Sequence, residues 1–382
     1  IVARRLDLDG VNTNDRFVVL IRRDLIAHEL FWKRGSLIAS WLSDKYHSIL
    51  HKNKTGGCRM NGLYDSVGRR IHYLRVAVTD RCNFRCQYCM PSEGVKWMEH
   101  NDILRYEEIL RIITAFASLG VDKVRITGGE PLVRKGIIGF LHKVTAIPGI
   151  KEVAVTTNGN MLEEYASLLK EAGVKRINVS LDTLDPERFK QITGHDALDR
   201  VLAGIKKAQE IGLTPIKLNM VVMNGINSDE IADFANLAIN NPYQVRFIEY
   251  MPFALERKYL FAADKMKQQL LKAGFAKLIP EMSNHSPAQI YRFPQAQGSI
   301  GFITPISQHF CSSCNRIRLT PDGNLKPCLL SNQEYSLRER LRAGISDQKL
   351  LDTIKQVIWN KPKECDLRNG GKGKRGMHRI GG

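Results

Sequence analysis

The sequence has no long apolar run: nowhere do about 18 hydrophobic residues follow one another, so we expect no membrane-spanning helix. It is also poor in acidic residues, with 39 Asp and Glu against 57 Lys and Arg, which leaves a formal net charge of +18. Such an excess favours an anionic partner, whether nucleic acid, a membrane surface or a small phosphorylated substrate. No basic stripe interleaved with aromatic residues is present, and this argues against nucleic-acid binding.

Cysteine is scarce outside two short stretches. Six of the eight cysteines form two groups of three, and the other two are Cys58 and Cys365. The chain lacks the short length, the dense cysteines and the signal peptide of a secreted disulfide framework. Groups of three thiols in a reducing compartment indicate metal ligands instead, and we expect a cytoplasmic location.

The first 59 residues carry no chemistry that we can identify. The apolar stretches Phe17–Arg22 and Leu37–Leu42 predict a strand and a short helix. Thr-Gly-Gly at residues 55–57, just upstream of Met60, is what translation of a purine-rich ribosome-binding site would give. Our hypothesis is that residues 1–59 are upstream read-through or follow a misplaced start. A transit peptide is the alternative, because the segment has several arginines and few acids.

From residue 71 the pattern alternates between strands and helices. Apolar, β-branched runs predict strands at Ile71–Thr79, Lys123–Thr127, Glu152–Thr157, Arg176–Leu181, Ile216–Met223 and Val245–Tyr250. Helical spacing of apolar residues predicts helices at Tyr106–Leu119, Gly136–Ala146, Leu162–Ala172, Leu198–Ile211 and Ser228–Ile239. Such alternation implies right-handed βαβ units around a parallel sheet. Six α/β units predict a partial (β/α)6 barrel of TIM type, although a doubly wound sheet fits the same alternation.

After about residue 255 this rhythm ends. A second cysteine group and a short strand pair follow, then helices near Leu337–Leu341 and Asp347–Trp359 and a basic, glycine-rich tail. The expected domains are an N-terminal extension (residues 1–59), a partial barrel (60–255) and a C-terminal region (256–382).

The first cysteine group, Cys82-x3-Cys86-x2-Cys89, follows directly on a predicted strand. This is the end of a barrel strand at which such folds place their active sites. Three thiolates on one loop can hold three irons of a 4Fe–4S cluster and leave the fourth iron open. The alternative is a structural zinc site with a fourth ligand elsewhere. The spacing, with Tyr88 before the last cysteine, favours the cluster and resembles that of radical S-adenosylmethionine (SAM) enzymes.

Two further motifs extend this resemblance. Gly128–Pro131 follows the second predicted strand and resembles the family motif for the amino group of SAM; alone it would indicate only a turn before a helix. Asn178–Asp182 ends the fourth strand, where the family uses the serine, here Ser180, for the SAM carboxylate. The resemblance implies that SAM chelates the open iron and that its C5′–S bond is cleaved by one electron, releasing a 5′-deoxyadenosyl radical.

The second group, Cys311-x2-Cys314-x13-Cys328, fits a zinc knuckle by spacing alone, with His309 nearby, as well as a second cluster. The neighbouring residues favour the second cluster over zinc. Cys314–Leu319 and the ending Met377–Gly382 resemble the GTP 3′,8-cyclase family of molybdenum-cofactor biosynthesis. The resemblance covers about residues 63–382 and includes Val78–Asn83, Arg125–Leu132, Thr156–Gly159 and Arg246–Glu249.

The resemblance implies a site in which two 4Fe–4S clusters, SAM and GTP meet, with the second cluster on Cys311, Cys314 and Cys328. An iron of that cluster free of cysteine would meet the guanine base. The residues implied to contact SAM are Tyr88, Gly129, Glu130, Ser180 and Met251. Those implied to contact GTP are Arg75, Arg125, Thr156, Lys217, Arg316, Ile317, Arg318, Gly381 and Gly382. Cys58 and Cys365 match no ligand position and are interpreted as bystanders.

Arg316 and Arg318 are implied to be catalytic, together with the first cysteine group. Two arginines spaced i, i+2 ordinarily make a solvated strand face. Beside a metal ligand they favour anion binding, because guanidinium forks match phosphate oxygens, and we expect both to face the triphosphate. The terminal Gly381 and Gly382 are implied to reach into the active site, where only glycines fit so narrow a gap.

The implied activity is a lyase reaction that converts GTP to 3′,8-cyclo-7,8-dihydro-GTP, through hydrogen removal from C3′ and attack of the carbon radical on C8. The resemblance also implies a reductant protein such as flavodoxin or ferredoxin, a homodimer, and transfer of the product to cyclic pyranopterin monophosphate synthase. Two alternatives are a radical SAM peptide maturase with an auxiliary cluster, which usually has more cysteines, and a zinc-stabilised, nucleic-acid-binding scaffold.

Overall fold

The structure, a computed structural model, describes residues 62–90, 94–252, 256–275, 278–281, 287–365 and 375–381. All of them belong to one compact unit, Asn61–Gly382. The predicted elements at Phe17–Arg22 and Leu37–Leu42, together with Cys58 and Gly382, lie outside the described residues. Within the described segments, no helix has the length and apolar character that crossing a membrane requires.

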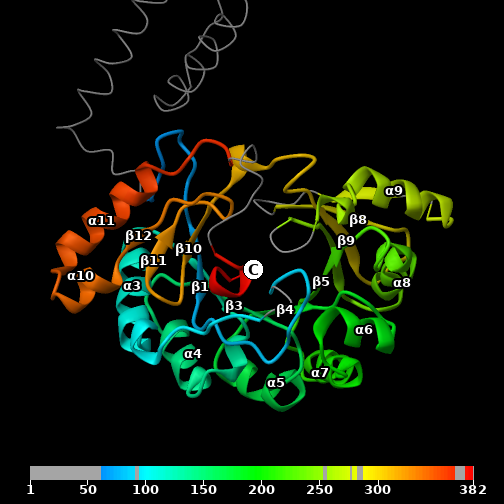
Figure 1. The fold of residues 1–382 in the computed structure, drawn as a ribbon, viewed down its shortest axis with the longest axis horizontal. Coiled ribbons are helices and arrows are strands. Elements are labelled where there is room, and N and C mark those ends of the chain that lie inside the picture. Colours follow the sequence, from blue (N-terminus) through cyan, green and yellow to red (C-terminus); the bar gives the residue numbers. More distant parts are fainter. Residues whose placement is uncertain are drawn as a thin grey trace, which may run out of the picture. The chain divides into compact units, whose positions relative to one another are not determined.

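Six parallel strands form the centre of the sheet in the order of the sequence (Figure 1). They are β1 (Tyr73–Ala77), β2 (Lys123–Thr127), β3 (Glu152–Thr157), β4 (Arg176–Ser180), β5 (Ile216–Val222) and β6 (Gln244–Glu249). Each is parallel to its neighbour. The strands curve in an arc with helices on the outside, so the predicted partial barrel of the α/β class is confirmed.

Strands from the C-terminal region extend this sheet at both edges. β10 (Arg316–Leu319) pairs in parallel with β1, and β9 (Ser299–Ile303) pairs in parallel with β6. Antiparallel strands lie beyond them: β11 (Asn324–Lys326), β12 (Tyr335–Ser336), β8 (Ala288–Arg292) and β7 (Ile279–Glu281). The order is β12-β11-β10-β1-β2-β3-β4-β5-β6-β9-β8-β7, and the described residues of β12 and β7 do not pair to close a ring.

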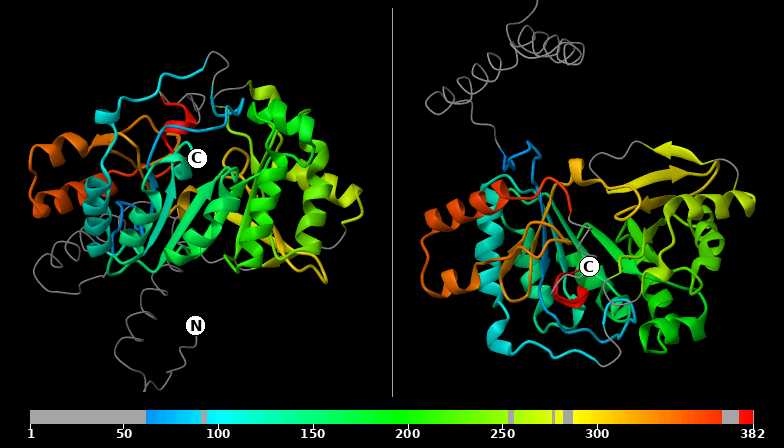
Figure 2. Two further views of the ribbon diagram at one scale, coloured as in Figure 1. Left: turned by 90° about the horizontal axis from the view of Figure 1, so that it is seen from below. Right: turned by 45° about the horizontal axis from the view of Figure 1, so that its top comes forward.

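The helices cover the outer face of the arc, and Figure 2 shows them alongside the strands. They are α3 (Tyr106–Ser118), α4 (Ile137–Thr145), α5 (Leu162–Glu171), α6 (Pro186–Thr193), α7 (Leu198–Glu210), α8 (Ile231–Asn240), α9 (Ala263–Lys272), α10 (Arg338–Arg342) and α11 (Asp347–Trp359). Short 3-10 turns are η1 (His100–Asp102), η2 (Pro131–Val133), η3 (Ser228–Glu230), η4 (Arg257–Tyr259), η5 (Cys311–Ser313) and η6 (Met377–Arg379).

Side-chain alternation along the strands separates the core from the inner face of the arc. Leu74 and Val76 on β1 are fully buried in the core between strands and helices. Most of the helices contribute an apolar stripe, as α3 does with Ile109, Ile112 and Phe116. The residues between the core positions of the strands point inward instead, and many of these are polar.

Candidate active site

A cavity of about 590 Å³ lies at the inner face of the arc. Side chains from β1 to β6, from β10 and from the C-terminal tail line it. Both predicted cysteine groups are among the lining residues: Cys82, Cys86, Cys89, Cys311, Cys314 and Cys328. The fold therefore brings together two groups that stand more than 200 residues apart in the sequence.

The lining of this cavity is strongly basic. Among the described residues that line it, none is Asp or Glu. The basic members are Arg75, Lys123, Arg125, Arg176, Lys217, Arg246, Arg316 and Arg318. So dense a set of cations without carboxylates is the lining expected for a polyanionic ligand.

Several of these basic side chains are buried and therefore poorly solvated, which disfavours their charged form and lowers their pKa. Burial lowers the pKa of Lys217 to about 6, with nearby Arg246 adding to the effect. Burial likewise lowers the pKa of Arg246 to about 9 and that of Arg318 to about 10. An anion bound in the cavity would offset the free-energy cost of burying these charges, because it places an opposite charge beside them.

Neutral and aromatic groups hold most of the cations in place. The Gln244 side-chain oxygen accepts hydrogen bonds from Lys217 Nζ at 2.7 Å and from Arg246 Nε at 3.0 Å. The guanidinium of Arg125 lies 5.5 Å from the centre of the Tyr73 ring, and the Arg125 Nε atom is buried without a hydrogen-bond partner in the described structure. These side chains are thus oriented while part of their donor capacity remains available to a ligand.

One carboxylate outside the cavity lining partly neutralises the basic residues at the start of the strands. Glu152 on β3 forms ion pairs with Lys123 at 3.0 Å and with Arg176 at 2.5 Å. Sequence reasoning did not predict Lys123, Arg176 or Arg246 as site residues. The first of these was recognisable, because Lys123 stands two positions before Arg125 and therefore on the same face of β2.

The loop of the first cysteine group is fixed by close packing against the Gly128–Gly129 turn. Gly129 N donates to Thr79 O at 2.8 Å. A Cβ atom added to Gly129 would lie 2.4 Å from Arg81 O, so any other residue would displace the loop that leads to Cys82. Burial raises the pKa of the Cys82 thiol to about 11 and that of the Cys89 thiol to about 12. Both thiols therefore stay protonated at neutral pH until a metal binds them.

Four of the five residues predicted to contact SAM line the cavity: Tyr88, Gly129, Ser180 and Met251. Glu130 lies elsewhere, since its carboxylate is fully buried and is not part of the lining. It accepts hydrogen bonds from Leu132 N at 3.0 Å, from Thr157 Oγ1 at 2.9 Å and from Asn158 N. In this structure the Glu130 side chain holds the β2 and β3 loops together.

The second cysteine group is assembled by a hairpin. Cys311 lies in η5, Cys314 precedes β10, and Cys328 follows β11, which pairs antiparallel with β10. The approach to η5 is held by Glu249 at the end of β6, whose carboxylate accepts from Ile306 N at 3.0 Å and Ser307 N at 2.9 Å.

The residues predicted to contact GTP are mostly gathered around this cavity: Arg75, Arg125, Thr156, Lys217, Arg316 and Arg318. Arg316 stacks 4.9 Å from the centre of the Phe310 ring. Ile317 faces the other way, fully buried in the core, because it alternates with the two arginines along β10.

The C-terminal tail, of which the structure describes residues 375–381, reaches the inner side of the arc of strands, where it is drawn in red (Figure 1). Arg318 Nη1 donates to Gly381 O. Gly381 has φ +75, and a Cβ atom there would lie 2.5 Å from Thr127 Cγ2. Both features restrict the position to glycine. Gly382 lies outside the described residues, so its predicted role stays a prediction.

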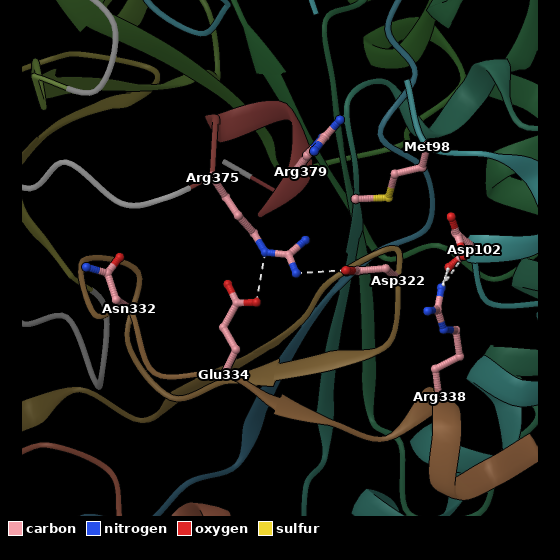
Figure 3. Close-up of a pocket in the computed structure, with 8 residues that line it drawn as sticks. All are labelled: Met98, Asp102, Asp322, Asn332, Glu334, Arg338, Arg375 and Arg379. Atoms are coloured by element: carbon pink, nitrogen blue, oxygen red, sulfur yellow. Dashed lines mark hydrogen bonds and ion pairs between the residues drawn. The ribbon is translucent and has the colours of Figure 1, made fainter. Parts of the chain in front are cut away.

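A polar pocket of about 470 Å³ holds the start of this tail (Figure 3). Arg375 points between two carboxylates of the β10–β12 region, with Nη2 at 2.7 Å from Asp322 Oδ2 and Nε at 2.8 Å from Glu334 Oε2. On the other side of the pocket Arg338 pairs with Asp102 at 3.0 Å. The Arg375 clamp therefore ties the tail to the hairpin that carries the second cysteine group.

In the part of the chain that the structure describes, no three His, Cys, Asp or Glu side chains are gathered closely enough to hold a single metal ion. The two groups of three thiols are the donor set that an iron–sulfur cluster with one open iron uses.

Family models match two consecutive parts of the chain. Residues 76–238 match the Radical SAM superfamily, and residues 243–367 match Molybdenum Cofactor Synthesis C. The first match contains Cys82–Cys89 and the second contains the later group of three cysteines.

Curated relatives match nearly their whole length. A GTP 3′,8-cyclase of Peptoclostridium acidaminophilum is 49% identical over 323 residues, which is 84% of this chain and 98% of the relative. A GTP 3′,8-cyclase of Moorella thermoacetica is 44% identical over 323 residues, or 84% of this chain and 100% of the relative.

Among solved structures, Streptococcus suis SuiB bound to S-adenosylmethionine is similar with a TM-score of 0.54 and 16% identity. The likeness covers 90% of this chain and 77% of that chain, and at this identity it shows the fold alone. Because the curated relatives are so similar over nearly their whole length, this chain belongs to the GTP 3′,8-cyclase family of radical SAM proteins.

Proposed function

We propose that this protein is a lyase that converts GTP to 3′,8-cyclo-7,8-dihydroguanosine 5′-triphosphate, the first step of molybdenum-cofactor biosynthesis. The observation that carries the proposal is the cavity itself, lined by two groups of three cysteines and eight basic side chains, with no carboxylate among its described lining residues. Such a lining suits a nucleoside triphosphate held between two iron–sulfur clusters. Neither the peptide-maturase nor the zinc-scaffold alternative accounts for so many cations around one cavity.

The family uses SAM and 4Fe–4S clusters, and the donor sets of this chain fit them. We propose Cys82, Cys86 and Cys89 as ligands of one cluster and Cys311, Cys314 and Cys328 as ligands of the other. When bound, the first cluster and SAM would supply the radical chemistry that removes a hydrogen atom from C3′ of GTP. Gly129, Ser180, Met251 and the backbone of Tyr88 are proposed to hold SAM beside the first group, since all four line the cavity.

The basic side chains orient GTP in this proposal. Arg316 and Arg318 share one face of β10 beside the second cysteine group and would bind phosphate oxygens through their guanidinium forks. Arg75, Arg125, Thr156 and Lys217 line the wall formed by β1, β2, β3 and β5. We add Lys123, Arg176 and Arg246 to these predicted contacts, because they line the same cavity. Fixing the nucleotide in this way sets the distance between C3′ and the radical source.

The tail serves to close the site. Arg318 holds Gly381 at the inner face, and Met377 and His378 form part of the lining. A tail in this position would exclude water and hold the reactants in place while the radical is present. The proposed roles of Gly381 and Gly382 rest on this placement, together with the lack of room for a side chain at Gly381.

Several finer statements are proposals that rest on family membership. We propose a radical SAM domain over residues 60–255, a C-terminal region over 256–382, and an extension over 1–59 that is not part of the native enzyme. The sheet runs through the boundary at residue 255, because β9 and β10 extend the barrel strands.

We further propose a cytoplasmic homodimer that receives electrons from flavodoxin or ferredoxin and passes its product to cyclic pyranopterin monophosphate synthase.

The test is anaerobic incubation of the reconstituted protein with SAM, dithionite and GTP. The proposal expects about eight irons per chain, as two 4Fe–4S clusters require. It also expects 5′-deoxyadenosine and the cyclised nucleotide in equal amounts. A colourless zinc protein, or 5′-deoxyadenosine formed without any change in GTP, would contradict it.

A further inference from the structure

A fourth thiol lies against the second cysteine group. The Sγ atom of Cys365 is 3.5 Å from that of Cys311, and Cys365 lines the same cavity. From the sequence this cysteine was interpreted as a bystander, since it matches no ligand position. Its placement beside Cys311 joins residues 54 positions apart, so the contact depends on the fold.

Two buried cations hold the segment of Cys365 in place. Arg69 donates from Nη1 to Cys311 O at 2.7 Å and to Lys363 O at 3.0 Å, and from Nη2 to Pro362 O at 2.7 Å. The Arg69 side chain is itself fixed by an ion pair with Asp65 at 2.6 Å.

The second cation is Lys361, which is 4% exposed. Its Nζ atom donates to Arg316 O at 2.9 Å and to Pro327 O, the residue before Cys328. The approach of Cys365 to Cys311 is therefore specified by charge-assisted hydrogen bonds on both sides of the cysteine group.

We propose that Cys311 and Cys365 form a reversible disulfide when the second cluster is absent. Their sulfur atoms need to approach by about 1.5 Å to reach the S–S bond length of about 2.05 Å, a change within reach of a rotation about the side-chain bonds. Cys311 cannot ligate iron and form a disulfide at once, so the two states exclude each other. The proposal rests on the proposed function in counting Cys311 as a cluster ligand.

The oxidant in this step is a low-molecular-weight disulfide. One of the two thiolates attacks it, forms a mixed disulfide and releases one thiolate of the oxidant. The second cysteine thiolate then attacks the mixed disulfide and releases the other. Two protein thiols thus give up two protons and two electrons, and one disulfide becomes two thiols. Both cysteines are half-buried at the cavity wall, which leaves the oxidant a route to them.

Such a bridge would protect the site between cluster loss and cluster insertion. A free thiolate that meets oxidants can proceed to sulfinic acid, which most proteins cannot reverse, whereas a disulfide is restored by thiols. Insertion of the second cluster would then require a reductant. Insertion of the first would not, because the described residues that line the cavity include no fourth cysteine beside Cys82, Cys86 and Cys89 outside the second group and Cys365.

The test begins with the full-length holoenzyme, stripped of iron anaerobically by a chelator and then treated with oxidised glutathione. Free thiols are alkylated, and peptides are mapped by mass spectrometry without reduction. We expect a Cys311–Cys365 cross-link in wild type and in the matched control C58S, and its loss in C365S. Disulfides only among Cys311, Cys314 and Cys328, or between Cys365 and Cys58, would overturn the proposal.

Reconstitution gives a second readout. Oxidised wild type should take up about half of its iron, roughly four of eight atoms, until dithiothreitol is added. In anaerobic holoenzyme, C365S should leave the iron content and the EPR spectrum unchanged. A changed spectrum of the second cluster would make Cys365 a cluster ligand and overturn the proposal. Failure to cyclise GTP would count against the proposed function alone, since cross-link mapping does not depend on turnover.

Discussion

The two cysteine groups line one cavity but are positioned in different ways. The first stands on eight consecutive residues, Cys82–Cys89, and rests against the turn at Gly128–Gly129 of the next βα unit. The second is drawn from η5 and a hairpin, and it depends on Glu249 and Arg69 from distant parts of the chain. A local loop can be damaged at one close contact, whereas an assembled group can be loosened from several remote positions.

The largest effect is expected at the close contact of the first group. Gly129→Ala places a Cβ atom within 2.4 Å of Arg81 O, so the backbone before Cys82 must move. We expect cyclisation to fall by at least 100-fold, or about 2.7 kcal/mol of transition-state stabilisation, with loss of the first cluster's EPR signal. The control is Gly139→Ala in α4, where nothing lies within 4 Å of the added atom. Equal activity in the two variants would contradict the packing argument.

The next effect tests how far the second group depends on remote support. Glu249→Gln removes the charge that accepts hydrogen bonds from Ala263 N, Ile306 N and Ser307 N. Such bonds to a buried carboxylate contribute on the order of 2 kcal/mol each. We expect iron content to fall towards half while the SAM-dependent signal of the first cluster remains. The exposed Glu163→Gln serves as control, and loss of both clusters together in Glu249→Gln would show that the groups are not independent.

A smaller effect is expected at the tail. Arg375→Gln breaks the clamp on Asp322 and Glu334 but leaves both cysteine groups untouched. We expect kcat to fall about tenfold, with the iron content and the GTP affinity little changed, because the tail acts mainly on closure of the site. Arg338→Gln, across the same pocket, loses its pair with Asp102 and should keep full activity. A tail clamp is excluded if the two variants behave alike.

The smallest effect is a pH dependence of GTP binding. Without a bound anion, burial lowers the pKa of Lys217 to about 6, so the amine is mostly neutral above that pH. A bound triphosphate raises this pKa, and binding therefore takes up a proton, which weakens GTP binding as the pH rises from 7.5 to 9. Calorimetry in buffers of different ionisation enthalpy measures the uptake. At pH 7.5, where Arg246 with its pKa of about 9 is still charged, the uptake should disappear in Lys217→Met, and equal uptake in that variant would assign the proton to another group.

The difference between the groups also explains what the sequence could predict. The bounds of β2 and β3 agree residue for residue with the predicted strands, because the apolar, β-branched pattern of a strand is a local signal. The spacing of the first cysteine group is also local, so it predicts a cluster-binding loop without knowledge of the fold. Helices α6 and α9 were not predicted, because both are rich in charged and amide side chains, which weakens the helical spacing of apolar residues. The barrel was expected to stop at six strands, yet β9 and β10 extend it, because strand pairing over long sequence distances leaves little trace in a local pattern.

The direction in which side chains point also limited what the sequence could predict about the site. Arg316 and Arg318 were expected on one face of a strand, and both line the cavity, while Ile317 between them enters the core. Glu130 belongs to a recognisable motif, but its carboxylate holds the backbone of neighbouring loops. The support given by Arg69 and Lys361 to the Cys365 segment had no local signal at all, because it joins residues that only the fold brings together.

We propose that this cavity directs the radical to C3′ of GTP. Anaerobic turnover with GTP carrying deuterium at C3′, followed by mass spectrometry of the products, tests it directly. We expect one deuterium in each 5′-deoxyadenosine and none retained at C3′ of the cyclised nucleotide. Unlabelled 5′-deoxyadenosine, formed while the label stays on GTP, would contradict it.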